Sequence, residues 1–551
     1  RTPVHLCNSR RFVLLAVIVL ALVACGGPGE PRGREPASAY MTGFYGVVAA
    51  DEPHAALVGR DVLSSGGTAA DAAVATYFTM AVTYPGAASL GGGGICLLHD
   101  YEVGRTESLE FLTTTSSKGV SDAQRPTGVP GNVRGMAALH ARYGQQSWTE
   151  LLRPAELLAR KGHPMSRALA TELIPAADFL FADTSARHIF SPRDGSAVAE
   201  GQIVHQPELA AVLSVLRGRG SGEFYSGELA RTLVEGVTAV GGMLTLDDLR
   251  GYKARYVEPI AVSFDAGVRS DAWLWASDQF TLFFTPTVGG GIAAQLWSIL
   301  DQDKRYRRTP IDEAPHLFAE ALLRVSSGSA RWLGKDGTSQ VDGDKLLSKD
   351  HLVNLMRGYD REQHRAVPGI FPHTSHNDTA SFVIADRFGQ AVACNFTLNY
   401  PFGTGRVAPG TGILLAASPG TGDHHTNHLG AMMLVRQKTN NVFYGAVASG
   451  GSAAPAAMVR VALETLVGHA DLSEAISNPR LYHPGLPDVL HTESGMAEAQ
   501  RVNLTVRGHQ LQAADRIGRV VAFYCPEGLP NRDRCECVTD PRGFGLAVGA
   551  E

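Results

Sequence analysis

The stretch HNDTASFVIADRFGQAVACNFTLNYPFGTGRVAPGTGILL, residues 376–415, decides the fold of this chain. Two apolar runs, 381–385 and 391–398, flank the turn sequence DRFG at 386–389. Apolar runs separated by a short turn that ends in glycine are typical of a β-hairpin. The sequence therefore predicts a hairpin followed by a glycine-rich turn.

Thr379 opens the first strand of this hairpin and is the candidate nucleophile. Folding the two runs about the turn places Thr379 opposite Phe396 and within one residue of Thr397. If the chain were cut before Thr379, the freed amine would accept the proton of the threonine hydroxyl, so that one residue supplies both nucleophile and base. The alternative is a threonine that merely opens a strand, which is the commonest role of this residue type in sheets.

Length and composition bound the class of protein. The chain has 551 residues, of which 44% are hydrophobic, enough for one large α/β unit or two to three domains. The net charge is -5, and no basic cluster is interleaved with aromatic residues, so we expect no nucleic acid as a partner. The 61 glycines fall in short clusters without a repeating period.

Residues 1–25 have the pattern of an export signal. Two arginines precede an apolar run at 12–24, which is too short to span a bilayer comfortably and ends in small residues. The sequence LVAC at 22–25 resembles a lipobox, in which Cys25 would be acylated; an ordinary cleaved signal and an uncleaved anchor are the alternatives. We expect an exported protein, periplasmic or at the cell surface, that meets a membrane only through this N-terminus, with a flexible linker at 26–42.

The cysteines fit an oxidising compartment. Cys96 and Cys394 lie in apolar runs and are expected to be buried free thiols. Cys525, Cys535 and Cys537 crowd one polar loop, for which we predict one disulfide. This loop offers no fourth ligand for zinc.

The first half of the chain supplies helices and close backbone contacts. Helical spacing over 55–77 is interrupted by a glycine pair at 66–67, which predicts two helices. The sequence PGAASLGGGG at 85–94 lacks the Lys-Ser/Thr of a phosphate loop, so it predicts a tight backbone approach beside another strand.

The middle of the chain is predicted to form supporting helices and not the functional site. Residues 128–260 alternate helical segments, such as 135–143 and 209–216, with polar turns, and Thr245 is the expected cap of a further helix. Residues 335–376 are polar and predict an exposed connector that reaches the proposed cut.

Several motifs, in order, resemble those of the γ-glutamyltranspeptidase (glutathione hydrolase) family, of which the chain looks like a divergent member. The resemblance runs from about Gly43 to the C-terminus. It rests on GGTAADAA at 66–73, SLGGGG at 89–94, GEFYSG at 222–227, residues 241–249 and 286–291, FGTG at 402–405, GILL at 412–415 and SGGS at 449–452.

The resemblance implies an α+β fold, the αββα sandwich of N-terminal-nucleophile hydrolases. It also implies a precursor that cuts itself between Asp378 and Thr379. The products would be a large-subunit segment, 43–378, and a small-subunit segment, 379–551, which stay associated as partners. The implied substrates are small γ-glutamyl or other amides.

The resemblance assigns roles to four further residues. Thr397 matches the threonine that hydrogen-bonds the nucleophile, and Gly450 and Gly451 match the pair whose N–H groups form the oxyanion hole. Asn399 matches a residue that contacts the α-amino end of the γ-glutamyl group. No cofactor and no metal are expected.

The departures from the family pattern lie at substrate recognition. Leu112 stands where the family has the arginine that clamps the glutamyl α-carboxylate. His428 and Leu429 replace a serine pair, residues 416–420 lack the expected acidic and amide groups, and Ala380 replaces a threonine. A buried carboxylate without a cation costs several kcal/mol. Ordinary γ-glutamyl binding should therefore be weak unless Arg406 or His428 substitutes.

The segment 423–428, DHHTNH, has two interpretations. Its closely spaced histidines suggest a metal site, whereas the family places here the loop that covers the pocket. We favour a shortened, open loop.

Three functions remain. The first is an exported amidohydrolase or acyltransferase acting on γ-glutamyl amides such as glutathione. The second is an acylase of the same fold with another acyl substrate, and the third is a non-catalytic surface protein. The joint presence of Thr379, Thr397, Gly450 and Gly451 argues against the third.

Overall fold

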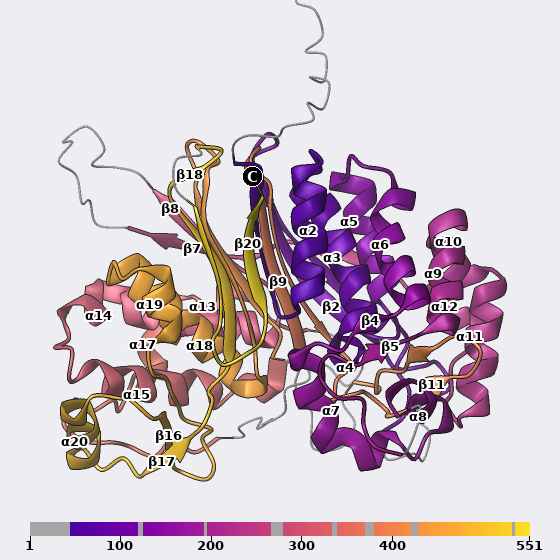
Figure 1. Cartoon of the computed structure of the whole chain (residues 1–551). Helices are drawn as coiled ribbons and strands as arrows, with labels where there is room; N and C mark the ends of the chain where they lie inside the picture. The colour runs from indigo at the N-terminus through magenta and orange to yellow at the C-terminus, as the bar shows by residue number, and fades with distance from the viewer. Residues whose placement is uncertain are drawn as a thin grey trace, which may run out of the picture. The chain divides into compact units, whose positions relative to one another are not determined.

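Two antiparallel sheets lie face to face at the centre of the protein, with helices on both outer sides (Figure 1). The structure is a computed structural model. It describes residues 44–119, 125–191, 195–265, 279–332, 339–369, 379–419, 428–531 and 535–550, all within a unit that spans Gly43–Glu551. The predicted signal, Cys25 and linker lie outside the described residues.

The seven-stranded sheet carries the hairpin at its centre. Its order is β20 (Leu546–Ala550), β1 (Gly46–Ala50), β9 (Thr379–Asp386), β10 (Ala391–Thr397), β2 (Gly93–Asp100), β3 (Arg105–Phe111) and β6 (Arg255–Val257). All its neighbouring pairs are antiparallel. Every residue of β9 and β10 is buried.

The six-stranded sheet packs against it through a shared core of small and branched side chains. Its order is β19 (Glu536–Thr539), β18 (Arg519–Leu529), β14 (Val442–Ser449), β13 (Ala431–Arg436), β8 (Phe280–Phe284) and β7 (Ile260–Phe264). Because each sheet is covered on both faces, its central strands are continuous apolar runs.

Two helical layers complete the sandwich (Figure 1). The layer on the seven-stranded sheet includes α2 (Pro53–Ser64), α3 (Ala69–Thr83), α5 (Asn132–Tyr143), α6 (Trp148–Lys161), α7 (Arg167–Leu180), α9 (Pro207–Arg219), α11 (Glu228–Ala239) and α12 (Leu246–Gly251). The other layer includes α13 (Val288–Asp301), α15 (Ala314–Ser326), α17 (Lys349–Leu355), α18 (Ala454–Ala462), α19 (Leu472–Ser477) and α20 (Glu498–Val506). The predicted αββα architecture is confirmed.

Several local predictions are confirmed. The glycine pair at 66–67 separates α2 from α3, and every residue of the alanine-rich α3 is buried. Thr245 caps α12 by accepting a hydrogen bond from the N–H of Asp248. The connector expected at 335–376 is only partly exposed where it is described, because Leu346 and Leu352 are buried.

The hairpin register differs from the prediction by one residue. Thr379 pairs with Thr397, and Phe396 pairs with Ala380. The turn is one residue longer than DRFG, because the N–H of Asp386 donates to Gln390 O, with Gly389 at a φ of 87°. The shift brings the two threonines directly opposite each other.

The glycine run before β2 is a close backbone contact, as predicted. A Cβ on Gly92 would lie 2.6 Å from Thr397 O, and one on Gly93 would lie 2.3 Å from Thr113 N. Any larger residue would push β2 away from the end of β10. These glycines therefore hold Thr113 and Thr397 close together.

The cysteine predictions were half right. Cys525 and Cys535 form the expected disulfide, and Cys537 is free. Cys96 and Cys394 are not free thiols, because they form a second disulfide. The sequence could not reveal this bridge, since it depends on β2 and β10 pairing Cys96 directly with Cys394.

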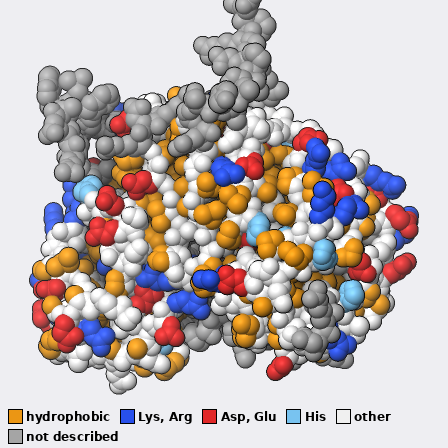
Figure 2. Space-filling view, in the orientation of Figure 1, with side chains coloured by type: hydrophobic (Ala, Val, Ile, Leu, Met, Phe, Trp, Pro, Cys, Tyr) orange, Lys and Arg blue, Asp and Glu red, His pale blue; other side chains and the backbone are white. Residues whose placement is uncertain are grey.

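The surface carries no single dominant charge on the face drawn in Figure 2. Basic and acidic side chains are interspersed there, and apolar side chains gather between the two helical layers. Over the stretches that the structure describes, no helix has the length and apolar character needed to cross a membrane.

Candidate active site

Thr379 and Thr397 form the centre of the candidate site. Thr379 is only 6% exposed, and among the described residues its buried hydroxyl has no hydrogen-bond partner. The hydroxyl of Thr397, on the paired strand, accepts a hydrogen bond from the N–H of Asn399 at 2.9 Å. Buried hydroxyls are nearly always hydrogen-bonded, so an unpartnered one needs an explanation. Availability to a reacting group is such an explanation.

Asn399 lies at the same end of the hairpin, in a left-handed conformation with φ of 65°. Its Nδ2 donates to Thr113 Oγ1 and to Ala417 O, both at 2.7 Å. These two bonds fix the amide plane. The carbonyl Oδ1 is then the side-chain atom left to accept a hydrogen bond from a ligand.

Gly450 and Gly451 form the turn that leads from β14 into α18. Their φ angles are 113° and 64°, which disfavour any side chain. A Cβ on Gly450 would also lie 2.8 Å from Gly518 Cα. Both conformation and space therefore require glycine at position 450.

The buried guanidinium of Arg519 ties these two parts of the site together. It donates to Thr379 O at 3.2 Å and to Ser449 Oγ at 3.0 Å, and Ser449 directly precedes Gly450. It also lies 3.8 Å from the carboxylate of Asp51 and 3.5 Å from that of Glu172. One side chain thus holds both the start of β9 and the end of β14.

The charges around Arg519 shift one another's pKa values. Burial raises the pKa of Glu172 to about 7, although Arg519 and a hydrogen bond from Tyr84 oppose this. Burial also raises the pKa of Asp51, again against Arg519. Burial alone would lower the pKa of Arg519, but Tyr84, Asp51 and Glu172 outweigh it and raise that pKa. The guanidinium therefore stays charged.

Sequence reasoning missed Asp51, Glu172 and Arg519. A usable signal was present for two of them, because Asp51 directly follows the apolar run of β1 and Arg519 opens the apolar run of β18. A charge at the end of a buried strand requires a partner. Glu172, inside α7, gave no such signal.

The structure also reveals Arg125 beside the hairpin end. Its guanidinium lies between the rings of Phe179 and Tyr400, 4.3 and 4.5 Å from their centroids. It donates to Gly403 O at 3.1 Å. Tyr400 follows Asn399, so this cation is close to the candidate site.

Leu112 borders a cavity of about 340 Å³. Thr113, which holds Asn399, is on the same wall, and Tyr252 donates its hydroxyl proton to Leu112 O at 2.6 Å. Arg255 also lines this cavity, but it is paired with Glu110 at 3.0 Å.

The two expected substitutes for the missing arginine lie in different places. Arg406 donates to Val240 O, just beyond the C-terminal end of α11. His428 is buried just before β13, where the N–H of Gly430 donates to Asn395 in β10. His428 is therefore the one next to the hairpin. Residues 423–427 of the suspected metal or loop segment lie outside the described residues.

The architecture defines a class of protein. Two stacked antiparallel sheets between helical layers, with a threonine opening a central strand, are the fold of the N-terminal-nucleophile hydrolases. Among solved structures, the cephalosporin acylase from Bacillus halodurans has this fold, with a TM-score of 0.77 at 22% identity, covering 95% of this chain and 99% of that one. The γ-glutamyltranspeptidase from Pseudomonas nitroreducens complexed with L-DON matches with a TM-score of 0.50 at 29% identity, covering 59% of this chain and 97% of that one.

Sequence comparison gives the family. The Gamma-glutamyltranspeptidase family model matches residues 55–431 and 423–550. The glutathione hydrolase proenzyme of Pseudomonas aeruginosa is 30% identical over 558 residues, covering 91% of this chain and 94% of the relative. The glutathione hydrolase proenzyme of Escherichia coli K12 is 28% identical over 519 residues, covering 86% of this chain and 87% of the relative. The chain belongs to the γ-glutamyltranspeptidase family and is a γ-glutamyltransferase-like hydrolase.

Proposed function

We propose that this protein is an amidohydrolase and acyltransferase in which Thr379 is the nucleophile. The observation that supports this most directly is the buried hydroxyl of Thr379, which lies opposite Thr397 and has no hydrogen-bond partner within the described part of the chain. The chain would first be cut between Asp378 and Thr379. The freed amine of Thr379 then serves as the base for its own hydroxyl.

The reaction follows from these groups. The hydroxyl proton passes to the amine as Oγ1 attacks the substrate carbonyl and the C=O π bond opens to an oxyanion. The N–H groups of Gly450 and Gly451 stabilise that oxyanion by about 3 kcal/mol per donor. The C–N bond then breaks, the leaving amine takes the proton, and an ester on Thr379 remains. Water or an acceptor amine attacks the ester and releases the acyl group.

Thr397 and Arg519 would position the nucleophile rather than react. Thr397 lies directly opposite Thr379, and Arg519 holds the carbonyl of Thr379. Asn399 would accept a hydrogen bond from the α-amino group of a γ-glutamyl substrate through Oδ1.

The Cys96–Cys394 disulfide gives the proposed cleavage a distinctive signature, because Cys96 precedes Thr379 and Cys394 follows it. On a denaturing gel we expect the cleaved protein to run as one species without reductant and as two after reduction. Replacing both Cys96 and Cys394 with alanine should give two bands without reductant. Replacing Cys525 and Cys535, which both follow Thr379, should not. Two bands from the unmodified protein without reductant would contradict the bridge.

We propose γ-glutamyl amides such as glutathione as the substrate class. One observation favours a second candidate, an acylase for a different acyl group. Leu112 offers no charge to a glutamyl α-carboxylate, and Arg255, in the wall of the adjoining cavity, is already paired with Glu110. Release of a chromophore from γ-glutamyl anilide, compared with anilides of uncharged acyl groups, decides between the two.

Restoring the missing cation tests the substrate directly. Leu112→Arg should lower the KM for γ-glutamyl anilide by about 10- to 100-fold, since a hydrogen bond to a charged group contributes about 1.5–3 kcal/mol. Leu112→Met is the matched control, because it keeps the apolar volume without adding charge. An unchanged KM in Leu112→Arg, with intact cleavage, would show that Leu112 does not face the carboxylate.

Export is part of the proposal. The charged, apolar and small-residue segments of residues 1–25 support it, with Cys25 as the acceptor of a lipid anchor.

A further inference from the structure

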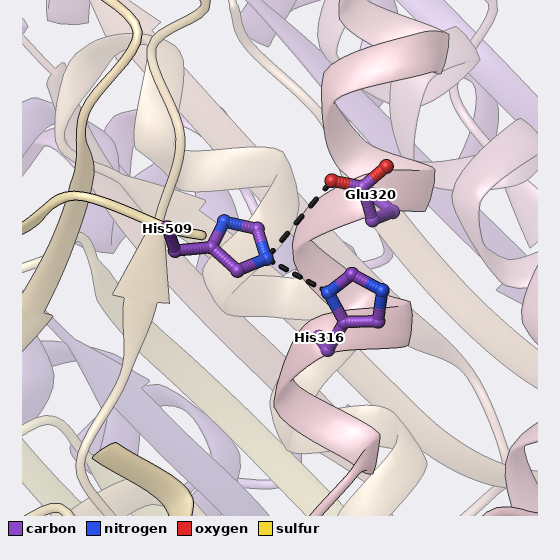
Figure 3. Close-up of side chains that lie close together, drawn as sticks. All are labelled: His316, Glu320 and His509. Atoms are coloured by element: carbon purple, nitrogen blue, oxygen red, sulfur yellow. Dashed lines mark hydrogen bonds and ion pairs between the residues drawn. The ribbon is translucent and has the colours of Figure 1, made fainter. Parts of the chain in front are cut away.

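A cluster of histidines and carboxylates lies in the helical layer outside the six-stranded sheet, away from the hairpin. His316 and Glu320 are one turn apart on α15, and His509 comes from the loop between α20 and β17 (Leu511–Ala514). Figure 3 shows the three side chains pointing toward one another. All three are buried, and their ligand atoms lie within 4.8 Å of one another. His364 adjoins them.

The spacing of the donor atoms suits a small metal ion. His316 Nδ1 lies 2.8 Å from His509 Nε2, which lies 4.0 Å from Glu320 Oε1. His364 Nδ1 lies 2.6 Å from the same Oε1. Four ligands at about 2.0–2.1 Å around tetrahedral zinc stand roughly 3.4 Å from one another. Two of these three separations, 2.6 and 2.8 Å, are shorter than this value and one, 4.0 Å, is longer, so binding an ion requires the side chains to move.

Two of the three histidines have the outer partners typical of metal ligands, whereas the Nδ1 of His509 has no hydrogen-bond partner among the described residues. His316 donates from Nε2 to Asp360 O at 2.9 Å, which leaves the lone pair of Nδ1 directed into the cluster. The Nε2 of His364 faces the carboxylate of Asp488 at 3.1 Å. Histidines that bind metals nearly always donate their second N–H to a carbonyl or carboxylate in this way. Arg324 holds the other oxygen of Glu320 at 2.6 Å.

We propose that His316, Glu320, His364 and His509 bind a structural transition-metal dication of the zinc class. Three imidazoles and one carboxylate are ligands that zinc prefers, and a site closed by four protein ligands is typical of a structural site. Hard cations such as Mg²⁺ prefer oxygen ligands and would bind poorly.

The ligands come from both sides of Thr379. His316, Glu320 and His364 precede it, and His509 follows it. If the chain is cut as proposed above, the ion would bridge the large and small subunits; this consequence, unlike the metal site itself, rests on the proposed function. Binding to the folded state alone would also raise stability.

Metal analysis of the full chain, purified without a histidine tag, tests the site. We expect about one zinc per chain after equilibration with Zn²⁺. A strong chelator should lower the melting temperature, which Zn²⁺ should restore and Mg²⁺ should not. The proposal would be overturned if the protein bound no zinc at micromolar free Zn²⁺ and its melting temperature did not change with the chelator. The four side chains would then form a hydrogen-bonded cluster only.

Variants locate the ion. His509→Gln should weaken zinc binding by more than about 100-fold, beyond the loss expected for an outer partner. His483→Gln is the matched control, because both ring nitrogens of His483 already have partners in Gly485 N and Asp488. The zinc affinity of this variant should stay within about 10-fold of that of the unmodified protein. Zinc that survives His509→Gln but is lost from a His424→Gln/His425→Gln variant would overturn the assignment.

Two further measurements test the metal site without relying on the His509→Gln variant. If His509→Gln does not fold, the visible spectrum of the Co²⁺-loaded unmodified protein should show tetrahedral nitrogen and oxygen ligation, and an octahedral spectrum would contradict the site. The uncut Thr379→Ala chain should bind zinc as tightly as the unmodified protein. If the unmodified protein binds zinc but is never cut before Thr379, the proposed function is refuted and the metal site is retained.

Discussion

Thr379→Ala is expected to remain a single uncut chain on a reducing gel and to lose amide hydrolysis by at least about 10⁴-fold. Removing the nucleophile of a covalent mechanism leaves only the contribution of binding and of the oxyanion donors. The fold should survive, because the Thr379 hydroxyl makes no hydrogen bond among the described residues. Gel migration and turnover of a chromogenic amide measure the two effects.

Two controls separate chemistry from packing. Thr379→Ser keeps the hydroxyl and should still be cut and retain part of the activity. Thr411→Ala removes another fully buried threonine hydroxyl, one that donates to Ala408 O, and should be cut normally. A Thr379→Ala chain that still appears as two bands after reduction would refute Thr379 as the cleavage nucleophile.

Arg519→Met is expected to destabilise the protein by about 3–5 kcal/mol and to abolish cleavage. The substitution leaves the carboxylates of Asp51 and Glu172 buried without their cation, which is among the costliest single changes in a protein. It also removes the guanidinium that donates to both Thr379 O and Ser449 Oγ. Urea denaturation measures the stability, and a reducing gel measures the cleavage.

The Arg519→Met deficit should grow as the pH rises. Burial already raises the pKa of Glu172 to about 7 and that of Asp51 above its ordinary value, and loss of Arg519 would raise both further. A carboxyl whose pKa is higher in the folded than in the unfolded chain destabilises the fold once the pH exceeds the unfolded value. The deficit should therefore be smaller at pH 5 than at pH 8.

Arg516→Met is the control for Arg519→Met. Arg516 is exposed and donates to Arg542 O, so its replacement should change stability by no more than about 0.5 kcal/mol. An Arg519→Met protein within 1 kcal/mol of the unmodified one, and cut normally, would contradict the role given to this cluster.

Local sequence patterns predicted the elements well. The hairpin 379–397, the break between α2 and α3, and the cap at Thr245 each depend on interactions within a few residues of one another. The glycine run before β2 was predicted for the same reason, since only glycine tolerates a backbone that close. The predicted register of the hairpin was wrong by one residue, because turn residues specify the length of a hairpin loop only loosely.

Contacts between distant segments could not be predicted. The Cys96–Cys394 bridge requires that β2 and β10 be neighbours, and the guanidinium of Arg519 meets Thr379 only because β18 and β9 lie in facing sheets. The histidine cluster likewise joins residues 316 and 509, which no spacing pattern relates.

By itself the sequence determined the hairpin that carries Thr379 and Thr397 and the close glycine run before β2, whereas the class of fold and the roles of Gly450 and Gly451 followed from the motifs it shares with a family. Hydrophobic periodicity, turn residues and the need for glycine each depend on a few neighbouring residues, so they can be recognised in the sequence. Only the tertiary structure decided which charges surround Thr379, which cysteines pair and which histidines converge. These depend on the packing of two sheets and two helical layers, which brings together residues hundreds of positions apart.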